Sequence, residues 1–379
     1  MTGSARSVWA DVDLGALLRN VEEVTRLAGG RHMIGAIKAD GYGFGAVEMA
    51  RALEQSGAYG LWTGNVGEAV AARRAGVEAK IIMFGGYLPD EVADLVRHDL
   101  VPTIHDGGGL AAAARVGARR GRAVPVYLKV DCGLGRLGVP VAEARDFARA
   151  VNADHRVHLE GVYTHLPFGD RAGREWAVER YAPFRDLLSG LARDGIEPKV
   201  TQVWGSAGVL SGLPDVSNAV CVGQLLYGLS PLAADVAPAR RFAPVLTALT
   251  ARLVHVGRHP GPSGPSTSGG YGGGTAGRTG VIAFGIRDGM RRPSGGRPMH
   301  ALVHGRPVPV VGVSLEHTVL ALDDVGEVGV GEEVVLIGES GRHEISLADW
   351  ASWFGDCSPL DIAVSILGRV DRRYRGAGH

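Results

Sequence analysis

The chain has 379 residues, and its 40 acidic and 40 basic residues cancel. This length exceeds one ordinary core and predicts two domains, or one large barrel with a smaller domain. The balanced charge argues against nucleic acid or a membrane surface as a partner. The three cysteines are an odd number and form no CxxC pair, so neither a zinc ribbon nor a disulfide framework is indicated, and no run reaches the ~18 apolar residues of a membrane span. Because no apolar segment marks its start, the chain is expected to be soluble and cytoplasmic.

Short apolar runs alternate with amphipathic stretches from residue 12 to residue 228. Eight of these runs are candidate strands: HMIGAIKA, YGLWTGN, AKIIMFGG, LVPTIHD, AVPVYLKVD, VHLEGVYTH, KVTQVWGS and NAVCVGQLLYG. The stretches between them, such as AVEMARALEQSG and PDEVADLVRHD, space their apolar residues three and four apart, as amphipathic helices do. The pattern predicts an α/β fold with an N-terminal (β/α)8 TIM barrel, whose active site lies at the carboxyl ends of its strands.

The pattern changes after YGLSP. The segments PVLTALTARLVHVG, TGVIAFGIRDG, PVPVVGVSLEHTVLAL, EEVVLIG and IAVSILGRV read as strands, with only a short helix, SLADWASWF, among them. We therefore expect the barrel at residues 12–235 and a mostly-β domain formed by residues 1–11 and 236–379. Between the first two strands of that domain lies a Gly/Ser-rich stretch typical of a linker, with Tyr271 in its middle.

Lysine is rare in this chain, which has only four: Lys38, Lys80, Lys129 and Lys199. Lys38 ends the first candidate strand, at the catalytic rim of such a barrel. A desolvated amine there has a lowered pKa and becomes a nucleophile toward carbonyls, including an aldehyde cofactor. Position alone also allows a strand-end lysine that reaches to solvent. The following DGYGFG favours the first interpretation, because its backbone N–H groups and tyrosine suit a phosphate.

The second motif is KVDCGLGRLGV, which contains Gly133, Gly135 and Gly138 in the spacing of a dinucleotide fingerprint. We discount that interpretation for two reasons. The motif follows the fifth strand of the series instead of opening a leading βαβ unit, and Arg136 would crowd a pyrophosphate turn.

These two motifs, followed by GVYTHLP, GSAG and VGQLLYGLSP, occur in the order and at roughly the spacing found in alanine racemases, which are pyridoxal-phosphate (PLP) enzymes. The chain resembles that family from about Val8 to Tyr374. The resemblance implies a barrel that binds PLP, a mostly-β second domain, an amino-acid substrate and a homodimer with shared active sites. No metal, nucleic acid or membrane is expected.

The resemblance also implies roles for single residues. Lys38 would carry the Schiff base to the cofactor, and Arg136 would meet the phenolic oxygen of the cofactor and the substrate carboxylate. Lys129, carbamylated in many family members, would brace Arg136, and His165 would lie beneath the ring network. Tyr271 would be the second base and reach the active site from the partner subunit. The phosphate would be held by Tyr42, Ser206, Gly223 and Gln224.

Several positions depart from the family pattern. Cys221 stands where racemases place the arginine under the pyridine nitrogen, and a thiol is a weak donor that cannot control the ring in the same way. Leu315 and Glu316 replace the Met-Asp pair that approaches the substrate carboxylate across the dimer. Ile286 and Leu360 replace two tyrosines near the entrance, and HFAT becomes HLPF.

Three functions therefore stay open. The leading one is a PLP-dependent racemase or epimerase of alanine-racemase type that inverts Cα with Lys38 and Tyr271, on alanine or on another amino acid. The second keeps the cofactor but performs transamination, elimination, decarboxylation or an aldol-type step. The third is a PLP-binding dimer without catalysis.

Overall fold

A computed structural model of the chain describes residues 7–233, 242–259, 277–294, 297–355 and 357–376. The chain divides into two compact units. The barrel unit comprises Ala16–Gly41 and Ala46–Ala243, and the β unit comprises Met1–Gly15, Tyr42–Gly45 and Pro244–His379. No helix in the described part of the chain is long and apolar enough to cross a membrane.

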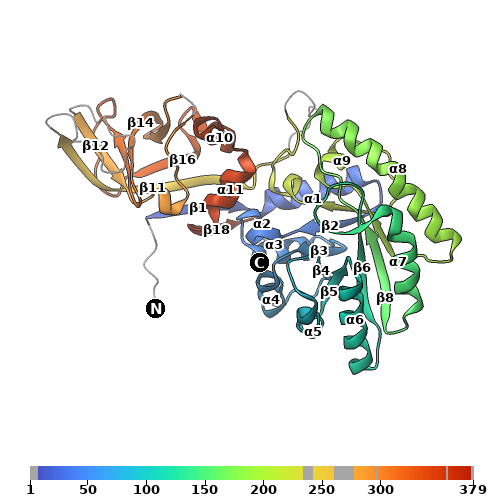
Figure 1. Cartoon of the computed structure of the whole chain (residues 1–379). Helices are drawn as coiled ribbons and strands as arrows, with labels where there is room; N and C mark the ends of the chain where they lie inside the picture. Colours follow the sequence, from blue (N-terminus) through green and yellow to red (C-terminus); the bar gives the residue numbers. More distant parts are fainter. Residues whose placement is uncertain (1–6, 234–241, 260–276, 295–296, 356, 377–379) are drawn as a thin grey trace. The chain divides into compact units, whose positions relative to one another are not determined.

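The barrel unit is built on parallel strands that close on themselves (Figure 1). They are β2 (His32–Ala36), β3 (Gly60–Thr63), β4 (Ile81–Met83), β5 (Leu100–Ile104), β6 (Val124–Asp131), β8 (Val157–Tyr163), β9 (Val200–Gln202) and β10 (Ala219–Val222). Neighbours run in the order β5-β4-β3-β2-β10-β9-β8-β6, and β5 also pairs with β6. Each strand falls within one of the eight predicted runs, so the predicted TIM barrel is confirmed. A short strand β7 (Val139–Pro140) adds to β6.

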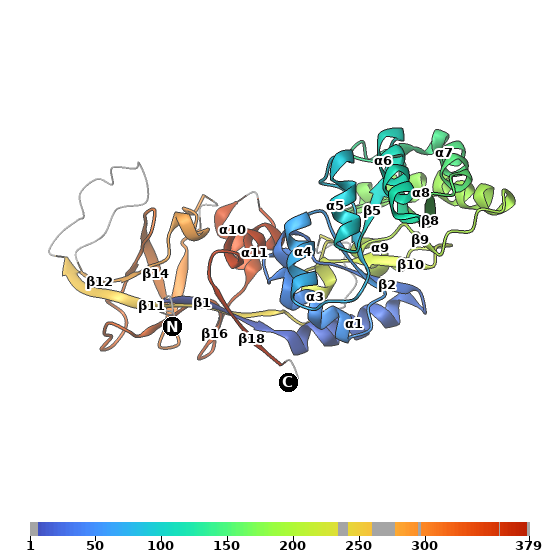
Figure 2. The same ribbon diagram turned by 90° about the horizontal axis from the view of Figure 1, so that it is seen from below.

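Helices follow the strands and cover the outside of the barrel, as Figures 1 and 2 show. They are α1 (Leu14–Ala28), α3 (Ala46–Gln55), α4 (Val66–Arg74), η1 (Pro89–Glu91), α5 (Val92–Arg97), α6 (Gly107–Arg120), α7 (Val141–Ala153), α8 (Arg171–Arg193), α9 (Ser206–Leu210) and η2 (Gln224–Tyr227). The short segment α2 (Lys38–Tyr42) is a turn, because its central residues are not in the α-helical conformation. Asn65, Asp106 and Asp170 begin α4, α6 and α8 by accepting a hydrogen bond from a first-turn N–H group.

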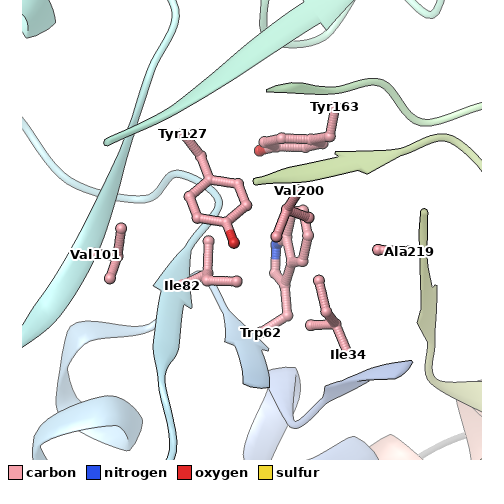
Figure 3. Packing of buried hydrophobic residues seen from close by; sticks show 8 residues of the cluster. All are labelled: Ile34, Trp62, Ile82, Val101, Tyr127, Tyr163, Val200 and Ala219. Atoms are coloured by element: carbon pink, nitrogen blue, oxygen red, sulfur yellow. The ribbon is translucent and has the colours of Figure 1, made fainter. Parts of the chain in front are cut away.

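Large side chains fill the barrel interior (Figure 3). The Trp62 ring meets Tyr163 edge-on at a centroid distance of 4.5 Å, and Tyr127 at 6.4 Å. Ile34, Ile82 and the remaining cluster members pack around these rings. A filled interior leaves the carboxyl ends of the strands as the place for chemistry.

The β unit contains a second sheet in the order β17-β16-β13-β14-β15-β12-β11-β1-β18. Its strands are β1 (Val8–Asp13), β11 (Leu246–His259), β12 (Gly277–Ile282), β13 (His300–Val303), β14 (Arg306–Val313), β15 (Thr318–Ala321), β16 (Glu333–Ser340), β17 (His343–Ile345) and β18 (Asp371–Arg375). Strand β1 lies beside β11, antiparallel to it (Figure 2), and its other edge pairs with β18. The predicted mostly-β second domain is confirmed.

Three helical segments accompany this sheet: η3 (Ile286–Asp288), α10 (Leu347–Phe354) and α11 (Pro359–Leu367). Helix α10 matches the predicted SLADWASWF. The strand predicted for IAVSILGRV is wrong, because most of this segment lies in α11. Ser358 accepts a hydrogen bond from the Asp361 N–H group while the Asp361 carboxylate accepts one from Ser358, a capping box that starts a helix. The apolar residues then bury one face at helical spacing: Ile362, Ala363, Ile366 and Leu367.

Candidate active site

Lys38 lies two residues after the end of β2 and opens an unusual turn. Ala39, Asp40 and Gly41 all have left-handed backbone angles, with φ between 53° and 61°, and Tyr42 follows with φ 58°. A left-handed conformation costs about 1–2 kcal/mol for each residue with a Cβ atom. Strain of this kind persists only where the surrounding structure enforces it, and it concentrates at functional sites.

The surroundings of Lys38 favour its neutral form. Burial lowers the pKa of the amine, and the positive charge of Arg136 lowers it further, while Cys221 has the opposite effect. The Nζ atom lies 5.7 Å from the centroid of the Phe84 ring. A neutral amine with a lowered pKa is the form that attacks a carbonyl carbon.

A second lysine shares this environment. Lys129 lies in β6, is 5% exposed, and has its Nζ atom 4.8 Å from the centroid of the Tyr163 ring. Burial lowers the pKa of Lys129 to about 8, with the charges of Arg136 and Lys38 acting in the same direction. Two lysines of the chain therefore lie at the same end of the barrel, and both have a lowered pKa.

The loop after β6 carries Arg136. The Asp131 carboxylate accepts hydrogen bonds from the N–H groups of Gly133 and Leu134 at 2.9 and 2.8 Å, and from Gly135 at 3.0 Å. This ties the loop to the end of the strand. Arg136 itself is exposed, so its guanidinium is available to an anion.

Gly138 closes this loop, and its replacement by alanine is expected to destabilise the protein by about 2–4 kcal/mol. Its φ is 127°, and an added Cβ atom would lie 2.6 Å from the backbone N of Asp131. Gly135→Ala is the matched control, because that glycine has φ 69° and open space around the Cβ position. Its cost should stay near 1–2 kcal/mol, roughly the strain alone. Urea unfolding of both variants measures the difference, and equal losses would contradict the proposed clash.

His165 follows β8 by two residues. Burial lowers the pKa of its imidazole to about 3, and the charges of Lys129, Lys38 and Arg136 contribute. The ring is therefore neutral across the physiological range. Its Cε1 atom would lie 3.6 Å from a Cβ atom placed on Gly205, an ordinary van der Waals distance, so the ring lies close to this residue.

This lowered pKa predicts an acid sensitivity. In the unfolded chain histidine titrates near ~6.5, so between that value and a folded pKa of about 3 the unfolded state binds more protons. Stability therefore falls as the pH drops through this window, by roughly 2–3 kcal/mol from pH 6 to pH 4. His165→Asn should remove this component from the pH dependence of urea unfolding of the cofactor-free protein. An unchanged slope in the variant would contradict the assignment.

Two neighbouring strands contribute a polar turn. Ser206 opens the segment after β9, Gly223 and Gln224 follow β10, and the Gly223 N–H group donates to Ser206 Oγ at 3.2 Å. Ser206 is 9% exposed, and Gln224 is partly exposed. A hydroxyl group and backbone amides gathered at strand ends can bind an anion such as phosphate.

Cys221 occupies β10 one residue before the strand ends. Burial raises the pKa of its thiol to about 12, although the charges of Lys38 and Lys129 pull it the other way. The thiol therefore keeps its proton near neutral pH. It packs against the aromatic cluster of the barrel interior.

The structure thus brings together five predicted residues whose charges and burial act on one another: Lys38, Lys129, Arg136, His165 and Cys221. Ser206, Gly223 and Gln224 lie after β9 and β10 of the same barrel unit. Tyr42 belongs to the β unit and is 7% exposed. Leu315 and Glu316 also belong to the β unit, where Leu315 is 71% exposed and Glu316 lies 3.8 Å from Arg287. Tyr271 lies outside the described residues.

Two residues near Lys38 were missed by the sequence reasoning. Glu68 accepts a hydrogen bond from the Asp40 N–H group, and Phe84 lies under the Lys38 amine. Asn65 and Glu68 have the spacing of a capping box, which predicts a helix start. It gives no indication that the carboxylate contacts the turn after the neighbouring strand, because that contact depends on the pairing of β2 with β3.

Comparisons with known proteins match nearly the whole chain to one family. Two family models match: "Alanine racemase, N-terminal domain" at residues 12–231 and "Alanine racemase, C-terminal domain" at residues 246–374. The alanine racemase of Symbiobacterium thermophilum is 34% identical and that of Halothermothrix orenii 31%, covering 98% of this chain and 98% and 97% of those proteins. The solved alanine racemase of Bacillus anthracis with bound L-Ala-P is 28% identical, with a TM-score of 0.87 over 99% of this chain and 96% of that one.

Proposed function

Because the chain belongs to the alanine racemase family, we propose that it inverts the Cα centre of a small amino acid, with alanine as the first candidate. The observation that carries the proposal is the Lys38 amine, whose pKa is lowered by burial at the end of the first barrel strand. Lys129 and Arg136 lie in the same electrostatic environment.

The residues present fit pyridoxal phosphate. An aldehyde requires an amine that is neutral near pH 7, and Lys38 is shifted in that direction. A phosphate requires hydroxyl and amide donors, and Ser206, Gly223 and Gln224 lie together after β9 and β10. We assign Tyr42 to the same phosphate as a further donor. Cys221 packs against the cluster of the barrel interior and interacts electrostatically with Lys38 and Lys129, and we propose that it would contact the cofactor ring.

When bound, pyridoxal phosphate supplies an electron sink that makes the Cα proton of an amino acid acidic. In the proposed reaction Lys38 Nζ takes or returns that proton on one face, and Tyr271 Oη does so on the other. Removal on one face and return on the opposite face inverts the centre. Tyr271 would come from the partner subunit of a cytoplasmic homodimer.

Arg136 would bind the substrate carboxylate, which Leu315 and Glu316 of the partner subunit would approach across the dimer. Lys129 would brace Arg136. At a pKa of about 8 a fraction of Lys129 is a neutral amine near neutral pH, which is the form that carbon dioxide modifies, so we propose carbamylation there. The carbamate would replace a positive charge beside Arg136 by a negative one.

One observation favours a second candidate, a different PLP reaction on the same scaffold. Cys221 keeps its thiol proton and is a weak hydrogen-bond donor. At the position that the resemblance assigns to an arginine under the cofactor ring, such a group exerts less control over the carbanion. Transamination or elimination would then compete with simple reprotonation.

A single experiment separates these functions. The full-length protein, supplemented with PLP, is incubated with L-alanine and other L- and D-amino acids in deuterated water. Deuterium at Cα together with loss of optical rotation supports racemisation. Release of a keto acid favours the second candidate, and no exchange despite a PLP absorbance band indicates a binding protein without catalysis.

A further inference from the structure

The carboxylate of Glu68 connects the turn after Lys38 to the neighbouring strand. Its Oε1 atom accepts a hydrogen bond from the Asp40 N–H group at 2.7 Å, and its Oε2 atom accepts one from Thr63 Oγ1 at 2.8 Å. We infer that Glu68 is a positioning residue that holds the left-handed turn and thereby directs the Lys38 amine into the site. This inference rests on the proposed function, since it concerns how Lys38 meets its cofactor.

The turn needs an external partner. The Gly41 N–H group donates to the Ile37 carbonyl at 2.8 Å, and the Asp40 carboxylate accepts from the Ala46 N–H group at 2.9 Å. These bonds fix the two ends of the turn. The Asp40 N–H group, in the middle of the strained backbone, donates to Glu68. A residue with a Cβ atom leaves the left-handed region readily unless such a contact holds it there.

Glu68 is itself well anchored. Thr63 is fully buried at the end of β3, and its hydroxyl also accepts a hydrogen bond from the Asn65 N–H group. Asn65 in turn accepts from the Glu68 N–H group as it begins α4. Strand β3 pairs with β2, and the Ile37 N–H group donates to the Trp62 carbonyl. The hydrogen bonds of the Glu68 carboxylate to Asp40 and Thr63, here called the clamp, therefore connect the ends of two adjacent strands, β2 and β3.

The position is an unfavourable one for a carboxylate, which supports a specific role. Burial raises the pKa of Glu68, and the nearby charge of Asp40 acts in the same direction. Only the hydrogen bonds to Asp40 and Thr63 favour the ionised form there. The same two bonds define the clamp, so its geometry and its charge state depend on the same contacts.

The test compares Glu68→Ala with Glu68→Gln in the full-length protein, first stripped of cofactor with hydroxylamine. Glu68→Ala should weaken PLP binding about tenfold and speed amide hydrogen exchange in the peptide covering residues 38–42 by a similar factor. Glu68→Gln keeps an acceptor for the Asp40 N–H group, so both readouts should stay within roughly threefold of wild type. Thr63→Val removes the anchoring hydroxyl and should give a PLP affinity and an exchange rate between those of wild type and Glu68→Ala. If Glu68→Ala does not fold, the Thr63→Val variant serves as the test.

Glu54→Ala is the matched control. The Glu54 carboxylate likewise accepts hydrogen bonds from backbone N–H groups, those of Glu78 and Ala79, but before β4 at the opposite end of the barrel. It should change exchange only around residues 78–79 and leave PLP affinity unchanged. The inference is wrong if both Glu68→Ala and Thr63→Val keep the wild-type rate of amide exchange in residues 38–42, or if both keep the wild-type affinity for PLP. Either result would leave the proposed function standing. Failure of the wild-type protein to bind PLP would overturn the proposed function and the inference with it.

Discussion

A Lys38→Ala variant is expected to show no absorbance band of bound PLP and to racemise at least about 10³-fold more slowly than wild type. The substitution removes two proposed roles of this amine, which are to hold the cofactor and to move the Cα proton on one face. Its lowered pKa in the buried setting after β2 makes it competent for both. Absorbance titration with PLP and a coupled racemase assay measure the two losses separately.

The matched control for this variant is Lys199→Ala. Lys199 precedes β9 at the other end of the barrel and lies 3.7 Å from Glu160, with its side chain largely exposed. Removing this amine deletes the same atoms without touching the proposed site, so the PLP band and the rate should match wild type. A Lys38→Ala protein that retains a reducible PLP adduct would contradict the assignment of Lys38.

Tyr271→Phe should block proton exchange from one enantiomer and leave it from the other. The variant lacks only the phenolic oxygen, and that oxygen is proposed to act on a single face of the substrate. Loss of a general acid or base slows its own step by about 10²–10⁴-fold. Exchange of the Cα proton with deuterated solvent, followed separately from L- and D-alanine by NMR, gives the two rates.

The comparison between enantiomers provides its own control, because a misfolded variant loses both rates together. Equal loss from both, or no loss from either, would contradict a one-face role for Tyr271. Tyr227→Phe offers a second control. The Tyr227 hydroxyl donates to the Ala36 carbonyl inside the barrel unit, so its removal tests stability without removing a proposed base.

The resemblance stated from short motifs is confirmed by the family matches, and with it the predicted class, a PLP-dependent isomerase of the alanine-racemase type. The eight barrel strands were predictable because each buried parallel strand is a short apolar run followed by an amphipathic helix. The segment IAVSILGRV was misread because a short apolar run fits a strand and a buried helix equally well. The Ser358–Asp361 capping box distinguishes them.

The site was only partly accessible from sequence. Lys38 stands out because it is a rare lysine at the end of a candidate strand. Arg136 stands out because it is a charged residue in a glycine-rich loop. The left-handed turn after Lys38 and its contact with Glu68 could not be predicted from the sequence. They arise from backbone angles and from the pairing of β2 with β3. The neutral state of His165 likewise follows from burial and from the nearby charges of Lys129, Lys38 and Arg136, which only the folding of the barrel brings to it.

We propose that Lys38, rather than another amine of the site, holds the cofactor. Lys129 is the natural rival, since burial lowers its pKa to about 8 in the same environment. Borohydride reduction of the PLP-loaded protein, followed by peptide mass mapping, fixes and locates the phosphopyridoxyl group. We expect this group on the peptide that contains Lys38. Its presence on the peptide that contains Lys129, or on neither, would contradict the role proposed for Lys38.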